Sequence, residues 1–252
     1  VELDQYPYTA SATYLGVYIP QKFQARGRAH TLELLRDKKA RQEIRKAMEQ
    51  VNPLEESNFQ NAGFAGTLIS RSPNHPEVEG MTVAELAEKW GKDPFDAAFD
   101  LLLEDNFDTD GIYFMMSEKD VIRVLQYRRT MVGTDGGGVM PGQITHPRIV
   151  GSFPQILGRY VRDLGVLEVE EAIRRMTSLP AQFFRLKNKG LLREGFDADL
   201  VVFDPLTIGC PSDYHTTVPN QGIKAVYIAG KKVVEDNIYN GTCAGQVIRA
   251  GR

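Results

Sequence analysis

The stretch "GIYFMMSEKDVIRVLQYRRTMVGTDGGG" (Gly111–Gly138) decides the fold, because it reads as strand, helix and strand in immediate succession. The segments "GIYFMM" (Gly111–Met116) and "TMVGTD" (Thr130–Asp135) are continuous apolar runs of the kind that a parallel sheet buries on both faces. Between them, capping residues and charged side chains predict a helix over Asp120–Gln126. Strands that alternate with helices in this way predict parallel α/β units.

The same alternation extends outward from this stretch in both directions. A strand is predicted within residues 1–20 and another at "GTLIS", and a capping box opens a helix at Thr82. The other helices are predicted over Leu32–Val51, Asp93–Asn106, Glu168–Met176 and Pro180–Leu186. From about Gly190 the chain turns to short strands with glycine turns, including a hairpin at Gly230-Lys231. We therefore predict an α/β domain over residues 1–188 and a small β domain over 189–252.

Composition narrows the class of protein. The 252 residues carry a net charge of -3, with 42% hydrophobic residues, which is typical of a soluble globular protein. No basic stripe predicts nucleic-acid binding, and no apolar run approaches the ~18 residues of a membrane span. Cys210 and Cys243 lie far apart without a CxxC motif, which favours a reduced, cytoplasmic protein. The chain begins at Val1 without a leader, which suggests a piece of a longer polypeptide.

Asp135 is the main candidate for chemistry. In a parallel α/β barrel the reactive groups lie at the carboxyl ends of the strands, and "TMVGTD" places Asp135 there. The glycines at 136–138 allow a tight turn or the close approach of a ligand to the backbone. The alternative interpretation is an aspartate that only caps its own turn.

Two residues in "THPR" are further candidates. Arg148 is suited to bind an anion, because a guanidinium binds a carboxylate through two hydrogen bonds, although a surface arginine is the alternative. His146 is either a ligand or a loop histidine, and the loop interpretation is favoured. No two of the four histidines have metal-ligand spacing, so the chain alone does not encode a complete zinc site.

With these motifs laid out, the chain resembles the C-terminal half of the D-aminoacylase family (N-acyl-D-amino-acid deacylases) of the amidohydrolase superfamily. The most selective part of the resemblance is the run that follows the aspartate, "HPRIVGSFPQILGRYVRDLG". Further matching segments are "DQYPYTASATYL", "EGMTVAELAEKWGKDPFDAAFDLLLED", "IYFMMSEKDVIRVL", "TMVGTDGGG", "EEAIRRMTSLPAQFF", "GLLREGFDADLVVFDP", "GIKAVYIAGKKVV" and "YNGTCAGQVIR".

The resemblance implies the C-terminal portion of a TIM-like (β/α)8 metal-dependent hydrolase barrel plus a small β-sandwich domain. It implies a zinc-dependent hydrolase that cleaves the acyl amide bond of small N-acyl-D-amino acids. Asp135 matches the carboxylate that takes a proton from water and delivers it to the leaving amine, and it is also a candidate metal ligand. Arg148 matches the residue that holds the substrate's α-carboxylate, with Tyr6 as a helper, and Gly136 lies in the loop over the substrate.

The chain also departs from the family pattern. Ala12 stands where the family usually has a serine, and "TDGGGV" replaces "SDGLPH". The family's metal ligands precede the "YPY" motif and are absent here, so the zinc ligands and the N-terminal half of the barrel are expected from elsewhere in the same chain or from another chain. Two alternatives stay open. They are a cyclic amidohydrolase of the hydantoinase or dihydroorotase type, and a non-catalytic fragment or scaffold subunit.

Overall fold

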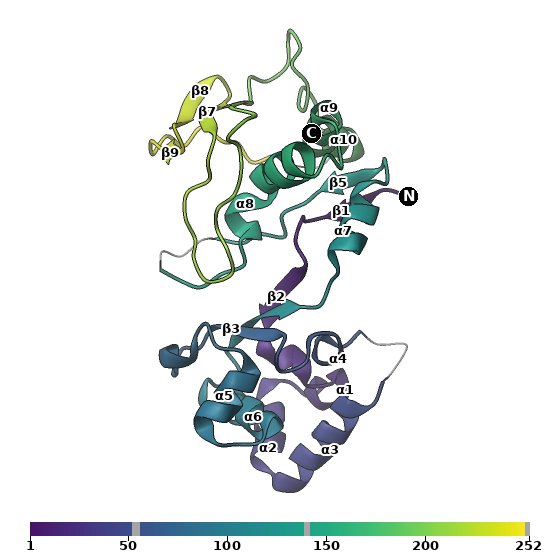
Figure 1. Ribbon diagram of the computed structural model, residues 1–252, viewed down its shortest axis with the longest axis vertical. Helices are drawn as coiled ribbons and strands as arrows, with labels where there is room; N and C mark the ends of the chain where they lie inside the picture. The colour runs from purple at the N-terminus through teal and green to yellow at the C-terminus, as the bar shows by residue number, and fades with distance from the viewer. Residues whose placement is uncertain (52–55, 139–141, 250–252) are drawn as a thin grey trace. The chain divides into compact units, whose positions relative to one another are not determined.

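The computed structural model describes residues 1–51, 56–138 and 142–249 (Figure 1). These residues form an α/β protein, as predicted, and divide into two compact units. Unit 1 comprises Val1–Pro7, Glu118–Val139 and Pro147–Arg252, and unit 2 comprises Tyr8–Ser117 and Met140–His146. The predicted boundary between residues 188 and 189 stays a prediction. Within the described ranges, no helix combines the length and the apolar character that crossing a membrane requires.

Unit 2 is built on a three-stranded sheet of β2 (Ala10–Tyr14), β4 (Asp110–Phe114) and β3 (Thr67–Arg71). β4 lies in the middle and is antiparallel to both neighbours. The apolar run that contains β4 predicted a parallel strand, and that direction is wrong. The run is apolar because β4 is central and Gly111, Ile112 and Tyr113 are buried. A central strand is buried because it has a neighbouring strand on each side, whether those strands run parallel or antiparallel to it.

The helices of unit 2 gather on one side of this sheet (Figure 1). Their buried side chains form one core with Ile69 of β3 and Tyr113 of β4. Tyr18 lies inside this core, and its hydroxyl donates a 2.6 Å hydrogen bond to Thr67. The helical segments are η1 (Leu15–Tyr18), α1 (Gln21–Gln24), α2 (Arg28–Arg36), α3 (Lys38–Glu49), α4 (Asn58–Ala62), η2 (Pro76–Val78), α5 (Val83–Trp90) and α6 (Pro94–Glu104).

Local capping signals set where these helices begin. Thr82 and Glu85 form the predicted capping box at the start of α5. Asp93 caps α6 with Pro94 in its first turn, also as predicted. The single helix predicted over Leu32–Val51 is instead two helices. The chain is extended at Asp37, whose carboxylate accepts a 2.7 Å hydrogen bond from the amide of Ala40 and starts a new helix.

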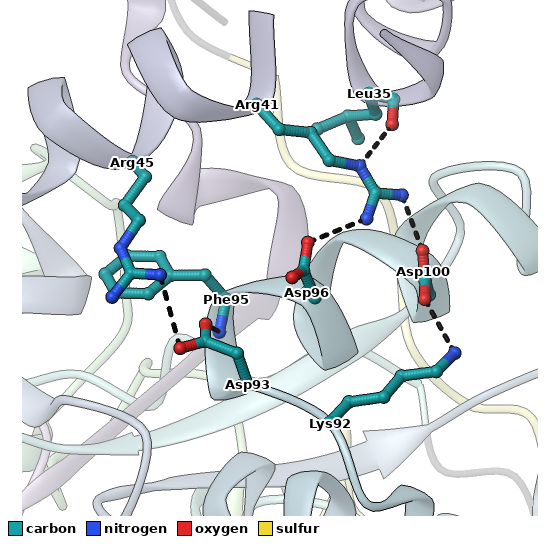
Figure 2. A network of polar contacts seen from close by, with 8 residues as sticks. All are labelled: Leu35, Arg41, Arg45, Lys92, Asp93, Phe95, Asp96 and Asp100. Atoms are coloured by element: carbon teal, nitrogen blue, oxygen red, sulfur yellow. Dashed lines mark hydrogen bonds and ion pairs between the residues drawn. The ribbon is translucent and has the colours of Figure 1, made fainter. Parts of the chain in front are cut away.

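A network of ion pairs joins α3 to α6 (Figure 2). Arg41 donates to the carbonyl oxygen of Leu35 at 2.6 Å and pairs with Asp96 at 3.0 Å and Asp100 at 2.5 Å. Lys92 is a second partner of Asp100, at 2.7 Å. These groups line a solvent-open groove of about 650 Å³. The ion pairs hold α3 against α6, and the groove also contains the cationic side chains of Arg36, Lys38 and Arg45.

Unit 1 contains a parallel pair of strands, β1 (Leu3–Gln5) and β5 (Thr130–Val132). This pairing confirms the prediction of a parallel strand at "TMVGTD". All three residues of β5 are buried. The helix α7 (Glu118–Leu125) leads into β5, and Gln5 donates a 3.1 Å hydrogen bond to the carbonyl of Val121 in that helix. β1, α7 and β5 therefore contact one another directly.

The remaining helices of unit 1 are α8 (Arg148–Gln155), η3 (Ile156–Asp163), α9 (Val169–Met176) and α10 (Ser178–Phe183). η3 continues α8 as a π-helix, and the change follows Pro154 within α8. Proline has no amide hydrogen, so the carbonyl of Val150, four residues earlier, lacks its helical donor. Asn220 replaces that donor, because its side-chain nitrogen lies 2.8 Å from the Val150 oxygen.

The C-terminal part of unit 1 is a four-stranded antiparallel sheet in the order β6-β7-β8-β9. The predicted hairpin is confirmed, but its turn lies one residue before the predicted Gly230-Lys231: Ala229 and Gly230 connect β7 to β8 with φ angles of 48° and 75°, and Lys231 is the first residue of β8. The strands are β6 (Leu200–Phe203), β7 (Ile223–Ile228), β8 (Lys231–Glu235) and β9 (Ile238–Tyr239).

Candidate active site

The end of β5 is shaped by a close approach between the two parallel strands. The amide of Gly133 donates a 3.0 Å hydrogen bond to the carbonyl of Gln5, which extends the pairing by one residue. A Cβ atom at Gly133 would overlap the carboxylate of Asp4, so a side chain there would require that carboxylate to move. Two residues later Asp135 has a φ angle of 44°, in the left-handed region. The chain therefore turns sharply where the strand pair ends.

Asp135 forms an ion pair with Arg148. A carboxylate oxygen of Asp135 lies 2.8 Å from Nη2 of Arg148, which is the first residue of α8. The two side chains differ in exposure, since 8% of the arginine and 69% of the aspartate is accessible to solvent. The structure thus places a buried cation against a carboxylate that is open to water.

Tyr6 completes this cluster. The guanidinium carbon of Arg148 lies 4.7 Å from the centre of the Tyr6 ring, in a cation–π contact. Tyr6 follows directly after β1. The other tyrosines of the N-terminal segment lie elsewhere, since Tyr8 and Tyr18 are buried in unit 2 and Tyr14 is exposed. Of the predicted site residues, the structure therefore brings together Asp135, Arg148 and Tyr6.

Gly136 lies between this cluster and the first turn of α8. Its amide donates a 3.3 Å hydrogen bond to the hydroxyl of Thr134. A Cβ atom at Gly136 would lie 3.1 Å from the Cα atom of Ile149, which is tighter than ordinary contact. The loop thus passes close to α8 because Gly136 has no side chain. The loop continues through Gly138 to residues 139–141, which lie outside the described residues.

His146 is part of the fold of unit 2, in agreement with the favoured loop interpretation. Its side chain is buried, and Nε2 lies 2.8 Å from the carbonyl oxygen of Ala10. A carbonyl only accepts, so Nε2 carries the hydrogen of this bond. The ring of Tyr8 packs against the imidazole edge at 5.1 Å. A histidine held in this way anchors a loop.

A metal centre needs more donors than this cluster offers. Across the described residues no group of three or more histidine, cysteine, aspartate or glutamate side chains is arranged to hold a metal ion. In the cluster itself one carboxylate, that of Asp135, is a suitable oxygen donor, and it already faces an arginine. The described residues therefore do not fit a zinc ion by themselves, and this chain offers at most one ligand from this cluster.

Sequence reasoning missed two residues that shape the cluster. Ser152 donates a 3.0 Å hydrogen bond to the carbonyl oxygen of Arg148, one helical turn earlier. The spacing of four residues within a helix is the signal that predicts this bond. Asp4 packs against Gly133. No sequence pattern predicts that contact, because Asp4 lies in β1 and Gly133 follows β5, far apart in the chain.

Comparison with known proteins places these motifs in a family. Residues 129–234, which include Asp135 and Arg148, match the model described as "Amidohydrolase family". The D-aminoacylase of Alcaligenes xylosoxydans xylosoxydans is 39% identical over 183 residues, covering 72% of this chain and 36% of that protein. The chain is related to D-aminoacylase over most of its length, as the sequence motifs predicted.

Solved structures agree with this relationship. A crystal structure of D-aminoacylase matches 98% of the chain with a TM-score of 0.73 and 33% identity, and 42% of that protein is covered. An N-acyl-D-glutamate deacylase from Bordetella bronchiseptica, solved with zinc and a phosphonate inhibitor, matches 92% of the chain with a TM-score of 0.68. That match is 33% identical and covers 39% of the deacylase. The chain thus spans less than half the length of the relatives it matches.

Proposed function

We propose that the protein containing this chain hydrolyses the acyl amide bond of N-acyl-D-amino acids, and that the chain forms the C-terminal part of that enzyme. The observation that carries the proposal is the buried Arg148 beside the exposed carboxylate of Asp135. One site then holds a group that binds a carboxylate and a group that accepts a proton. An N-acyl amino acid needs both, because it has an α-carboxylate next to the amide to be cleaved. The relatives are named for this reaction.

In this proposal each residue has a defined role. Arg148 binds the α-carboxylate of the substrate, and the ring of Tyr6 keeps the guanidinium in place. Asp135 accepts a proton from water, and the resulting hydroxide adds to the acyl carbonyl carbon. The carbon–nitrogen bond then breaks, and Asp135 returns the proton to the departing amine. The products are a carboxylate and a free D-amino acid. Gly136 keeps the loop beside the substrate narrow.

Zinc is the proposed cofactor, with its ligands mostly outside this chain. The N-acyl-D-glutamate deacylase relative was solved with zinc, and this chain offers at most Asp135 from the cluster as a ligand. When bound in such a hydrolase, zinc polarises the amide carbonyl and makes hydroxide available near neutral pH. The residues of this chain would then bind the carboxylate and carry the proton.

The proposed architecture is a TIM-like (β/α)8 barrel whose C-terminal portion lies within residues 1–188, followed by a small β-sandwich over 189–252. The parallel pair β1 and β5 supports it, because a two-stranded parallel sheet is normally part of a larger one. The remaining strands would come from the N-terminal half of the barrel, in the same chain or another. We place the enzyme in the cytoplasm, without a nucleic-acid or membrane partner.

An assay of the full-length protein tests the proposed function. N-acetyl-D-amino acids, their L-enantiomers and hydantoins are supplied separately, and the release of free amine or ring opening is measured. We expect turnover of the N-acetyl-D-amino acids well above that of the other two. Preferred turnover of hydantoins would favour the cyclic amidohydrolase instead. Failure to hydrolyse any of these amides with zinc present would favour a scaffold subunit.

A further inference from the structure

The groove between α3 and α6 contains more positive than negative charge. Its cationic and acidic side chains are Arg36, Lys38, Arg41, Arg45, Lys92, Asp93, Asp96 and Asp100. Each of the three aspartates has an arginine partner, at distances of 3.2, 3.0 and 2.5 Å. These acids balance Arg41, Arg45 and Lys92 in number, so the charges of the other two cations are left over.

The two cations left over are Arg36 and Lys38. Arg36 is the last residue of α2, Lys38 is the first residue of α3, and both residues are exposed. Neither forms an ion pair with any residue in the ranges that the structure describes. Asp37 lies between them in the chain but does not line the groove, and its carboxylate accepts the amide hydrogen of Ala40. The groove therefore offers two cations that no acid of the groove neutralises.

The corner that carries these cations, residues 36–38, is held in place on both sides. The capping bond of Asp37 fixes the start of α3. Arg41 fixes the end of α2, because its Nε donates a 2.6 Å hydrogen bond to the carbonyl oxygen of Leu35 while its other two nitrogens pair with α6 (Figure 2). An anion that binds at the corner thus meets a backbone that is already ordered, which lowers the entropic cost of binding.

The rest of the groove is suited to the organic part of a small molecule. Phe95 and Phe99 of α6 line it, and the guanidinium of Arg45 lies over the Phe95 ring, 4.4 Å from its centre. The volume of about 650 Å³ lies within the range of roughly 300–1,000 Å³ that is usual for small-molecule sites. A single inorganic ion at the corner would leave most of this space to solvent.

We propose that this groove binds a small molecule that carries a phosphate monoester, with the phosphate at Arg36 and Lys38. Such a group has a charge of about −1.5 to −2 near pH 7, which matches the two unbalanced cations. Its three terminal oxygens accept charge-assisted hydrogen bonds from both side chains. A carboxylate matches less well, because it has one charge and two oxygens. This inference concerns unit 2 alone and does not rest on the proposed function.

The acids of α6 favour a compact ligand over a long polyanion. The side chains of Asp93 and Asp96 are 39% and 54% exposed along the same groove. A nucleic acid or an acidic peptide that extended from the corner along α6 would meet these carboxylates and be repelled. A single phosphate at the corner avoids them, and an uncharged organic part beside α6 is not repelled.

The test uses the full-length protein and isothermal titration calorimetry with ribose 5-phosphate, ribose and inorganic phosphate. We expect ribose 5-phosphate to bind roughly tenfold more tightly than inorganic phosphate, because the sugar adds contacts in the groove, and ribose alone not to bind. In the double variant Arg36→Gln, Lys38→Gln the affinity for ribose 5-phosphate should fall by roughly tenfold or more, because two charge-assisted contacts are lost. Both residues are exposed and without ion pairs among the described residues, so the fold should stay unchanged in circular dichroism.

The matched control is the double variant Lys39→Gln, Lys46→Gln. Both lysines are exposed residues of α3 that do not line the groove, and the control loses the same net charge. Its affinity for ribose 5-phosphate should stay within about twofold of the wild type, because salt screens charges at a distance. Equal losses in the two double variants would overturn the proposal, and so would a wild type that binds no ribose 5-phosphate at millimolar concentration. Equally tight binding of inorganic phosphate would overturn the assignment of an ester in favour of the free ion.

A third variant tests the charge argument by a gain of affinity, which misfolding would not produce. Asp96→Asn removes a half-exposed carboxylate from the groove and leaves the charge of Arg41 less balanced. We expect ribose 5-phosphate to bind about threefold more tightly to this variant. Unchanged or weaker binding by folded Asp96→Asn would contradict recognition through the excess positive charge.

Discussion

The side-chain amide of Asn220 donates a 2.8 Å hydrogen bond to the carbonyl oxygen of Val150, the oxygen that Pro154 leaves without a helical donor. A residue seventy positions along the chain thus repairs a break inside α8. Val150 lies two residues after Arg148, the first residue of α8. The hydrogen bond therefore connects the helix of the candidate site to the segment before β7.

The hydrogen bond from Asn220 to Val150 predicts that the effects of substituting Asn220 and Pro154 on stability depend on each other. Asn220→Ala should lower the free energy of unfolding by about 1–2 kcal/mol, because a half-buried carbonyl loses its partner. Pro154→Ala restores an amide hydrogen within the helix, so Asn220→Ala should cost less in that background. Urea unfolding of the four proteins measures both values. Equal losses from Asn220→Ala with and without Pro154 would show that the hydrogen bond does not compensate for the proline.

The proposed general base predicts a loss of catalysis without a loss of structure. In the full-length enzyme, Asp135→Asn should reduce kcat by roughly two or more orders of magnitude, because the amide cannot accept the proton. The fold and the zinc content should stay near normal, as measured by circular dichroism and metal analysis. Asp120→Asn, at an exposed site in α7, is the matched control and should leave kcat unchanged. Near-wild-type turnover of Asp135→Asn would remove this residue from the mechanism.

The ion pairs of Glu171 with Arg174 and Arg175 predict that the free energy of unfolding falls in acid. Hydrogen bonds from Arg174 and Arg175 lower its pKa from 4.5 to about 2. Because the folded state favours the ionised form, this stabilisation is fully present above pH 4.5 and disappears as the pH falls toward 2. Glu171→Gln should therefore cost about 1–2 kcal/mol at neutral pH, a value reduced for partial exposure of the carboxylate.

The test compares the free energies of unfolding of the wild type and Glu171→Gln from pH 7 to pH 2. The difference between them should shrink below pH 4.5, the ordinary pKa of the carboxyl group. Glu170→Gln is the control, since Glu170 is exposed one position earlier in α9. A difference that stays constant down to pH 2 would mean that the two arginines do not stabilise the charged form.

The contacts of His75 with two glutamates in unit 2 predict that the free energy of unfolding depends on pH with the opposite sign. Burial alone would lower its pKa, but hydrogen bonds to Glu77 and Glu104, at 3.2 and 2.5 Å, raise it above 6.5. The folded state thus favours the protonated ring. Its stabilisation is fully present below pH 6.5 and is lost as the pH rises through the raised pKa.

An NMR titration of the His75 ring, assigned by its absence in His75→Asn, should give a midpoint above 6.5, the ordinary value. Glu104→Gln should lower the midpoint, because one of the two carboxylates loses its charge. A midpoint at or below the ordinary value in the wild type would show that burial outweighs both acids.

Sequence patterns predicted those parts of the fold that depend on neighbouring residues. Thr82 and Glu85 identified the start of α5, and Pro94 that of α6, because a capping bond joins residues a few positions apart. The direction of β4 was not predictable in this way, since it depends on strands that begin at Ala10 and Thr67. The break at Asp37 had a local signal, the capping aspartate, within a pattern that otherwise favoured one long helix.

The same distinction between local and long-range features applies to the candidate site. Asp135 was predicted because it follows a buried strand, which is a local pattern. Its partner Arg148 and the ring of Tyr6 were placed near it by the family resemblance, because no spacing within the sequence joins residues 6, 135 and 148. Their contacts arise from the pairing of β1 with β5 and from the turn at Gly133, both of which bring distant segments together.

The two ends of the longer segment of unit 2, Tyr8–Ser117, lie next to each other: the amide of Met116 donates a 3.0 Å hydrogen bond to the carbonyl of Thr9. On the other side of these points, Gln5 and Val121 are already bonded within unit 1. The segment between them therefore begins and ends at one place, so a change of length in one of its surface loops would leave the pairing of β1 with β5 intact.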